Sequence, residues 1–306
     1  MIAGDVETGI GMVEATVKLT SEFFEAEVAA LGAELVRLTD RDGRDLLWNG
    51  DPAFWSGRAP LLFPIVGRLP GDQLVHEGVA YPMAQHGFAR RRVFALEAHD
   101  GASARFVLAA DAQTREQYPF DFVLRVTYTL VEATLAVEVV VENPGAVPLP
   151  ASVGFHPAFR WPLPYGGTRD GHRLIFEKAE TAPIHRPVGG LLSTATEANP
   201  AVDTIIEPTD AMFERDALIF LDLRSHHVRY GVPGEPGLEV AFPGMPHLGL
   251  WSKPGAPFLC IEPWAGYATP QVAPVEFTQK PGLSHIPPGG AQAFGLSVRW
   301  LPDIGR

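Results

Sequence analysis

The stretch FVLRVTYTLVEATLAVEVVVE, residues 122–142, indicates the fold class more clearly than any other part of the chain. It is rich in Val, Thr, Tyr and Phe, the residue types enriched in β-strands. Glu132–Thr134 interrupts it near the middle, and Asn143–Gly145 ends it, so it predicts two strands joined by a short turn. Because its second half is nearly continuous Val, we predict that this strand is buried on both faces.

Outward from this stretch, the chain shows the same broken pattern of short strands and turns. Residues 27–38 alternate loosely before a tight turn at Asp40–Gly43. Twenty-nine prolines leave little room for long helices, and we expect one short helix within residues 201–215. Further strands are predicted at residues 217–223, 237–242, 248–251, 258–261 and 293–301.

The predicted fold is therefore all-β, a β-sandwich-like domain that spans residues 16–306, with few short helices. A chain of 306 residues is long enough for two domains, but no linker or internal repeat divides it. Residues 1–15 contain several glycines and acids without a sustained hydrophobic period, and we expect a flexible leader there.

Composition excludes several classes of partner. The formal net charge is −12 and no basic tract is present, so the chain lacks the charge pattern that binds nucleic acid. Its apolar runs fall far short of a membrane span, and its start is acidic where a signal peptide carries Lys or Arg. We therefore expect a cytoplasmic protein that is a monomer or weak homodimer. A single cysteine, Cys260, excludes an internal disulfide and a multi-cysteine zinc site.

No nucleophile elbow, phosphate-binding loop or zinc-protease helix occurs in the sequence. Polar, titratable residues instead stand inside apolar, turn-bounded segments, which are residues 61–68 with 85–90, residues 153–160, and residues 248–253 with 258–266. Glu262 follows the apolar run Phe258–Ile261, and we expect Pro263 to end that strand. Desolvation there would raise the pKa of Glu262 and suit it to general-base work; the alternative is an edge-strand Glu that points into water.

The other candidate residues have comparable alternatives. His156 lies between Phe155 and Pro157, where it is either a functional group or a hydrogen-bonded core histidine. His86 precedes a glycine and an arginine-rich run, a pattern typical of a loop at the mouth of a site. Arg68 follows an apolar run, from which an arginine either extends to solvent or holds a hydroxyl-rich or anionic ligand. Trp251, like Trp161 and Trp264, borders these polar residues.

These segments resemble those of aldose 1-epimerases, in the same order along the chain. The motifs are LLFPIVGR at residues 61–68, QHGF at 85–88, GFHPAF at 154–159, and WSKPG at 251–255 with CIEPWAG at 260–266. The similarity is greatest to a bacterial branch distinct from galactose mutarotases, and a weaker resemblance runs over residues 16–301. Because His156 is followed by Pro-Ala-Phe, where galactose mutarotases carry a different run, galactose specificity is not implied.

The resemblance implies a galactose mutarotase-like β-supersandwich with an open sugar-binding cleft, and an isomerase that interconverts the α and β anomers of an aldose. His156 matches the family's general acid and Glu262 its general base. Arg68 and His86 match residues that hold ring and hydroxyl oxygens, and Asp216 is the best candidate for the sugar-binding Asp. The reaction requires neither a cofactor nor a metal.

Two alternatives remain open at this stage. One is a non-catalytic carbohydrate-binding protein on the same scaffold, which would use Trp251, Trp264 and the polar cleft. The other is a mutarotase for hexose 6-phosphates, for which Arg90–Arg92 or Lys253 would supply the extra positive charge. The sequence does not identify the sugar.

Overall fold

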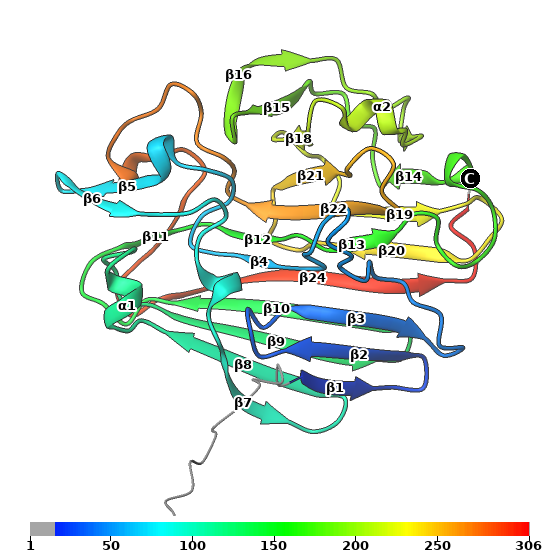
Figure 1. Cartoon of the computed structure of the whole chain (residues 1–306), viewed down its shortest axis with the longest axis horizontal. Helices are drawn as coiled ribbons and strands as arrows, with labels where there is room; N and C mark the ends of the chain where they lie inside the picture. The colour runs from blue at the N-terminus through cyan, green and yellow to red at the C-terminus, as the bar shows by residue number, and fades with distance from the viewer. Residues whose placement is uncertain (1–15, 306) are drawn as a thin grey trace, which may run out of the picture.

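The computed structural model describes residues 16–305, and the leader expected over residues 1–15 lies outside this range. Two large antiparallel sheets face one another, with β22 and β24 crossing the middle of the molecule in Figure 1. One sheet contains, in order, β17 (Ile205–Ile206), β14 (Arg173–Phe176), β19 (His227–Gly231), β20 (Gly237–Ala241), β24 (Ala291–Leu301), β10 (Thr134–Glu142), β9 (Val123–Val131), β8 (Ser103–Ala109) and β7 (Ala95–His99). The other contains, in order, β16 (Leu191–Glu197), β15 (Ile184–Val188), β18 (Leu218–Phe220), β21 (His247–Trp251), β22 (Phe258–Ala265), β12 (Val153–Phe155) and β4 (Leu61–Leu62), with β13 (Ala158–Arg160) also on β22.

Smaller elements complete the domain. They are the sheet β1 (Thr16–Thr20), β2 (Phe24–Ala29) and β3 (Leu35–Asp40), and the strand pairs β5 (Gln73–His76) with β6 (Val79–Pro82) and β11 (Leu149–Ala151) with β23 (Ser284–Ile286). The α-helices of the described range, α1 (Ala112–Arg115) and α2 (Asp210–Phe213), have four residues each. No helix in this range is long and apolar enough to span a lipid bilayer. The all-β prediction is confirmed.

The hairpin predicted from residues 122–142 forms as β9 and β10, which pair in register around a turn at Glu132 and Ala133. The prediction that β10 is buried on both faces is wrong. Its residues alternate between buried and exposed, and Ala136 and Glu138 are exposed. One face of the sheet packs into the core and the other faces solvent, as antiparallel sheets commonly do.

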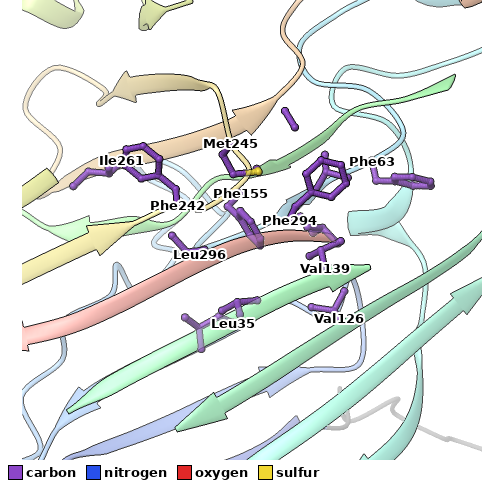
Figure 2. Packing of buried hydrophobic residues seen from close by; sticks show 14 of the residues in the cluster. Leu35, Phe63, Val126, Val139, Phe155, Phe242, Met245, Ile261, Phe294 and Leu296 are labelled. Carbon is purple, nitrogen blue, oxygen red and sulfur yellow. The ribbon is translucent and has the colours of Figure 1, made fainter. Parts of the chain in front are cut away.

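The core fills the space between the sheets. Figure 2 shows Val126 and Val139 of the larger sheet on one side and Phe155 and Ile261 of the other sheet across from them, with Leu296 among them. The sheet β1–β3 covers another part of the same buried face, where the hydroxyl of Tyr128 donates to the carbonyl of Ala33.

The loosely alternating segment is divided between two strands. Residues 27–38 form parts of β2 and β3, separated by a turn that includes Gly32, rather than one strand. The short helix expected within residues 201–215 is confirmed as α2, and residues 205–206 of the same segment form β17.

Strand β22 positions the residues of the site. All eight of its residues are buried. Leu259 and Ile261 face the core between the sheets. Side chains alternate along a strand, so Cys260, Glu262 and Trp264 point to the opposite face. That face is covered by a separate set of loops and aromatic residues.

Pro263 does not end β22, contrary to the sequence prediction, since the strand continues to Ala265. The backbone N–H of Ile261 donates to the carbonyl of Pro157, in the gap between β12 and β13. Backbone groups of residues i and i+2 point to the same side of a strand, so the nitrogen of Pro263 faces this gap as well. The missing N–H therefore removes no bond from the ladder with β21.

Candidate active site

A cavity of about 350 Å³ lies on the face of β22 that carries Glu262. Its volume is near the lower end of the range of about 300–1,000 Å³ for small-molecule pockets. The residues that line it are Trp55, Val66, Gly67, Gln85, His86, Arg90, His156, Pro187, Gly190, Asp216, Ala217, Ile219, Trp251, Glu262, Trp264 and Ala268. The cavity thus combines aromatic surfaces with a small set of titratable groups.

Glu262 and His156 meet in this cavity. Glu262 lies within β22, and His156 lies where the chain passes from β12 to β13 along the same strand. Nε2 of His156 is 3.2 Å from Oε2 of Glu262. Glu262 is 2% exposed, which excludes the alternative of an edge-strand Glu in solvent.

Burial changes the acidity of both groups. Desolvation raises the pKa of Glu262 well above its ordinary value, and the negative charge of Asp216 raises it further. Desolvation lowers the pKa of His156, and the positive charge of Arg90 acts in the same direction. Both shifts favour the neutral forms. The pair therefore holds one proton, since Glu262 resists ionisation and His156 resists protonation.

The other nitrogen of His156, Nδ1, is buried and has no hydrogen-bond partner among the described residues. Glu262, which lies against Nε2, is therefore the described protein group that can set the tautomer of this imidazole. Aromatic rings hold the imidazole in place. Trp55 stacks on it at 4.8 Å between ring centroids, and Trp251 meets it edge-on at 5.9 Å.

Both ring nitrogens of His86 are in contact with protein groups, since Nε2 lies 3.2 Å from the side-chain amide of Gln85. Its Nδ1 accepts from the backbone N–H of Gly67 at 3.1 Å, which leaves the proton of the neutral ring on Nε2. Burial lowers its pKa well below the ordinary value, and the positive charges of Arg90 and Arg91, with that of His156 when it is protonated, act in the same direction. His86 therefore stays neutral at physiological pH.

The backbone around His86 explains the glycine that follows it. His86 and Gly87 both have positive φ, and a Cβ on Gly87 would lie 2.1 Å from the carbonyl oxygen of Phe63. Only glycine allows the two loops to approach this closely. The loop at residues 61–67 and the loop at 85–88 are thus joined, which brings their motifs to one wall.

Asp216 enters the cavity from the turn between α2 and β18, and it has a left-handed backbone with φ of +71°. Trp251, at the end of β21, meets Trp55 edge-on, and both rings line the cavity. The structure therefore brings five of the sequence-predicted residues together: His86, His156, Asp216, Trp251 and Glu262.

Arg68 is not among the residues that line the cavity. Its guanidinium forms two hydrogen bonds with Asp72, of 2.5 and 2.6 Å, and its side chain is 42% exposed. It packs against Gly190 in the turn between β15 and β16, so it supports that turn from outside. Trp161 is also absent from the lining, because it is buried beneath the guanidinium of Arg169.

Arg90 lines the cavity, and the sequence identified it only as one of four possible extra cations. Among residues 16–305 no hydrogen bond or ion pair engages its guanidinium, whereas Arg91 donates to Gly87 and Arg92 pairs with Asp111. Lys253 donates to the carbonyls of residues 53 and 54.

Trp55 is a further residue that sequence reasoning missed. It follows Phe54 in a loop with Pro and Gly, a pattern that gave no sign of contact with His156.

His156, Cys260 and Glu262 form a group whose potential metal-ligating atoms lie within 4.8 Å of one another. Burial and the nearby Glu262 raise the pKa of the Cys260 thiol well above its ordinary value. A metal-binding cysteine is a thiolate, so this environment opposes the form that a cation needs. The geometry instead suits exchange of protons between a carboxyl group, an imidazole and a hydroxylated ligand.

Comparison with known proteins adds independent information. The sequence pattern described as aldose 1-epimerase matches residues 15–281. The LacX protein of Lactococcus lactis, in its plasmid-encoded form, is 33% identical over 267 residues, which covers 83% of this chain and 89% of LacX. A galactose mutarotase-related enzyme from Lactobacillus acidophilus superimposes with a TM-score of 0.86 at 28% identity, covering 94% of this chain and 97% of that one. A galactose mutarotase-like protein from Lactobacillus casei gives the same TM-score at 27% identity, with 94% and 100% covered.

Proposed function

Because this chain belongs to the aldose 1-epimerase family, we propose that it interconverts the α and β anomers of an aldose, with Glu262 and His156 as its catalytic residues. The observation that carries the proposal is the contact of 3.2 Å between these two side chains at one wall of a sugar-sized cavity. Both groups are buried, and burial shifts both pKa values toward the neutral forms.

The reaction removes a proton from the C1 hydroxyl and adds one to the ring oxygen. Glu262, ionised, takes the hydroxyl proton while protonated His156 donates to the ring oxygen, and the C1–O5 bond breaks to give the open-chain aldehyde. After rotation about C1–C2, the same transfers run in reverse and close the ring on the other face. The pair starts and ends with one proton.

The shifted pKa values favour the ring-opening step and oppose the charged forms that precede it. Ring opening converts an ionised Glu262 and a protonated His156 into their neutral forms, which burial favours. Sugar hydroxyls that enter the cavity would stabilise the charged forms before the reaction. His86, as an Nε2–H donor, and Asp216, as an acceptor, would hold the remaining oxygens.

A phosphorylated aldose is the second candidate substrate, and Arg90 is the observation that favours it. Its half-buried guanidinium has no hydrogen bond or ion pair in the described range, although the charge of Glu34 acts on it, and such a group is suited to a phosphate or carboxylate.

Anomer exchange measured by NMR on glucose, galactose and glucose 6-phosphate tests the proposal. Exchange faster than the buffer rate supports it, and the ratio of kcat/KM for the free and phosphorylated sugars decides between the substrates. Saturable binding without faster exchange would contradict catalysis and indicate a carbohydrate-binding protein.

A further inference from the structure

Asp216 reaches the cavity from a short and unusual turn. The helix α2 ends at Phe213, and the backbone N–H of Asp216 donates to the carbonyl of Phe213 at 3.0 Å. Asp216 itself has a left-handed backbone, which is uncommon for a residue with a side chain. Its Oδ1 accepts from the N–H of Ala217 at 2.8 Å. The direction of this carboxylate therefore depends on what holds the turn.

Arg186 holds that turn from the neighbouring strand β15. Its Nη1 donates to the carbonyls of Met212 and Asp216, each at 2.8 Å. Its Nε donates to Oε2 of Glu197, on β16, at 3.2 Å. The side chain is 12% exposed; its bonds to Met212 and Glu197 are partly buried, and its bond to Asp216 is exposed.

Arg186 also lies at an irregular position of β15. The pairing of β15 with β16 shifts register between His185 and Pro187, which places Arg186 at the irregularity. Pro187 comes next in the chain and lines the cavity. The guanidinium of Arg186 thus connects the β15–β16 hairpin to the turn that carries Asp216. Because the guanidinium is planar, the relative directions of its N–H donors are fixed.

We propose that Arg186 is a positioning residue that fixes the Asp216 carboxylate against the sugar, although Arg186 does not line the cavity. This inference rests on the proposed function, since it takes Asp216 as a sugar-binding group. Glu197 completes the arrangement by pairing with the guanidinium. The same carboxylate also pairs with Arg215, a residue of the turn itself, whose side chain is 71% exposed and has no hydrogen bond to the turn's backbone in the described structure. Arg215 is therefore the matched control.

The test is a double-mutant cycle on anomer exchange with the whole chain: wild type, Arg186→Met, Asp216→Asn and the double variant. We expect Arg186→Met to lower kcat/KM about tenfold or more, mainly through KM, since well-oriented hydrogen bonds are lost. The double variant should match Asp216→Asn within about twofold, because Arg186 acts through Asp216. Arg215→Met should stay within about twofold of wild type.

If the losses in kcat/KM of the two single variants multiply in the double variant, the proposal is overturned, because Arg186 would then have a general structural role. If Arg186→Met does not fold, Arg186→Lys replaces it in the cycle. Lys keeps the charge but lacks the planar fork, so a raised KM is expected again, and an unchanged KM overturns the proposal.

Failure of the proposed function has a separate signature, which is a wild-type chain that does not accelerate anomer exchange. The cycle is then measured on glucose affinity by intrinsic fluorescence, since three tryptophans line the cavity. Equal glucose affinities of the double variant and Asp216→Asn support the positioning role of Arg186. Independent losses, or no affinity in the wild type, overturn it.

Discussion

Oε2 of Glu262 lies 3.2 Å from Nε2 of His156, and both side chains are almost completely buried beside a cavity that opens to solvent. In this environment each group favours its neutral form. The two therefore titrate as a pair, whose apparent pKa values belong to both residues.

The first prediction concerns pH. The active pair carries one proton, so kcat/KM should remain level from mildly acidic to neutral pH. It should fall as the pH rises through the upper pKa of the pair, which burial of Glu262 places well above the ordinary Glu value. A pH profile of anomer exchange, corrected for the buffer rate, measures this. An alkaline limb whose pKa equals the ordinary value for Glu would contradict this prediction.

Asp216→Asn should move this alkaline limb to lower pH, because the charge of Asp216 is one cause of the raised pKa of Glu262. The other groups near the pair do not titrate in this range. Burial keeps the Cys260 thiol protonated and His86 neutral, and Arg90 stays charged. An alkaline limb that is unchanged in Asp216→Asn would show that the two carboxylates are not coupled.

Trp55 should matter for catalysis because its ring stacks on His156 at 4.8 Å. Trp55→Ala would expose the imidazole to water and loosen its orientation, and we expect kcat/KM to fall by about 10–100-fold. Trp55→Phe keeps an aromatic face and should retain most of the activity. Steady-state anomer exchange for both variants, with melting temperatures, gives the comparison; equal losses in both would argue against the stacking role.

Substitution of the two arginines near the cavity, Arg90 and Arg68, should change KM to different extents. Arg90 lines the cavity without a protein partner in the described range, whereas Arg68 is engaged by Asp72. We therefore expect Arg90→Met to raise KM more than Arg68→Met, by about tenfold or more for a phosphorylated sugar. The KM values for glucose and glucose 6-phosphate decide this. A larger effect of Arg68→Met would show that Arg68 turns toward the ligand when sugar binds.

The sequence predicted the fold class because strand propensity and turn residues are local properties. The hairpin at residues 122–142 formed as expected. Burial of β10 was mispredicted, since a run of Val does not reveal whether a second layer covers the outer face. Pro263 was mispredicted as a strand end because its effect depends on which neighbour its nitrogen faces. Both errors concern partners that are distant in the chain.

The site was predictable to the extent that its residues stand in distinctive motifs. His86, His156 and Glu262 were identified in this way, and they share one cavity. The contact of Trp55 with His156 was not predictable, because it depends on how the loop around residue 55 folds over β22. The engagement of Arg68 by Asp72 likewise depends on side-chain geometry.

The central claim is that Glu262 and His156 exchange protons with the sugar. Its most direct test is the anomer exchange rate of Glu262→Gln and His156→Asn, measured by NMR on fully folded protein. We predict that kcat falls at least about 100-fold in each variant while the melting curve stays cooperative. Wild-type turnover in either variant would contradict the claim.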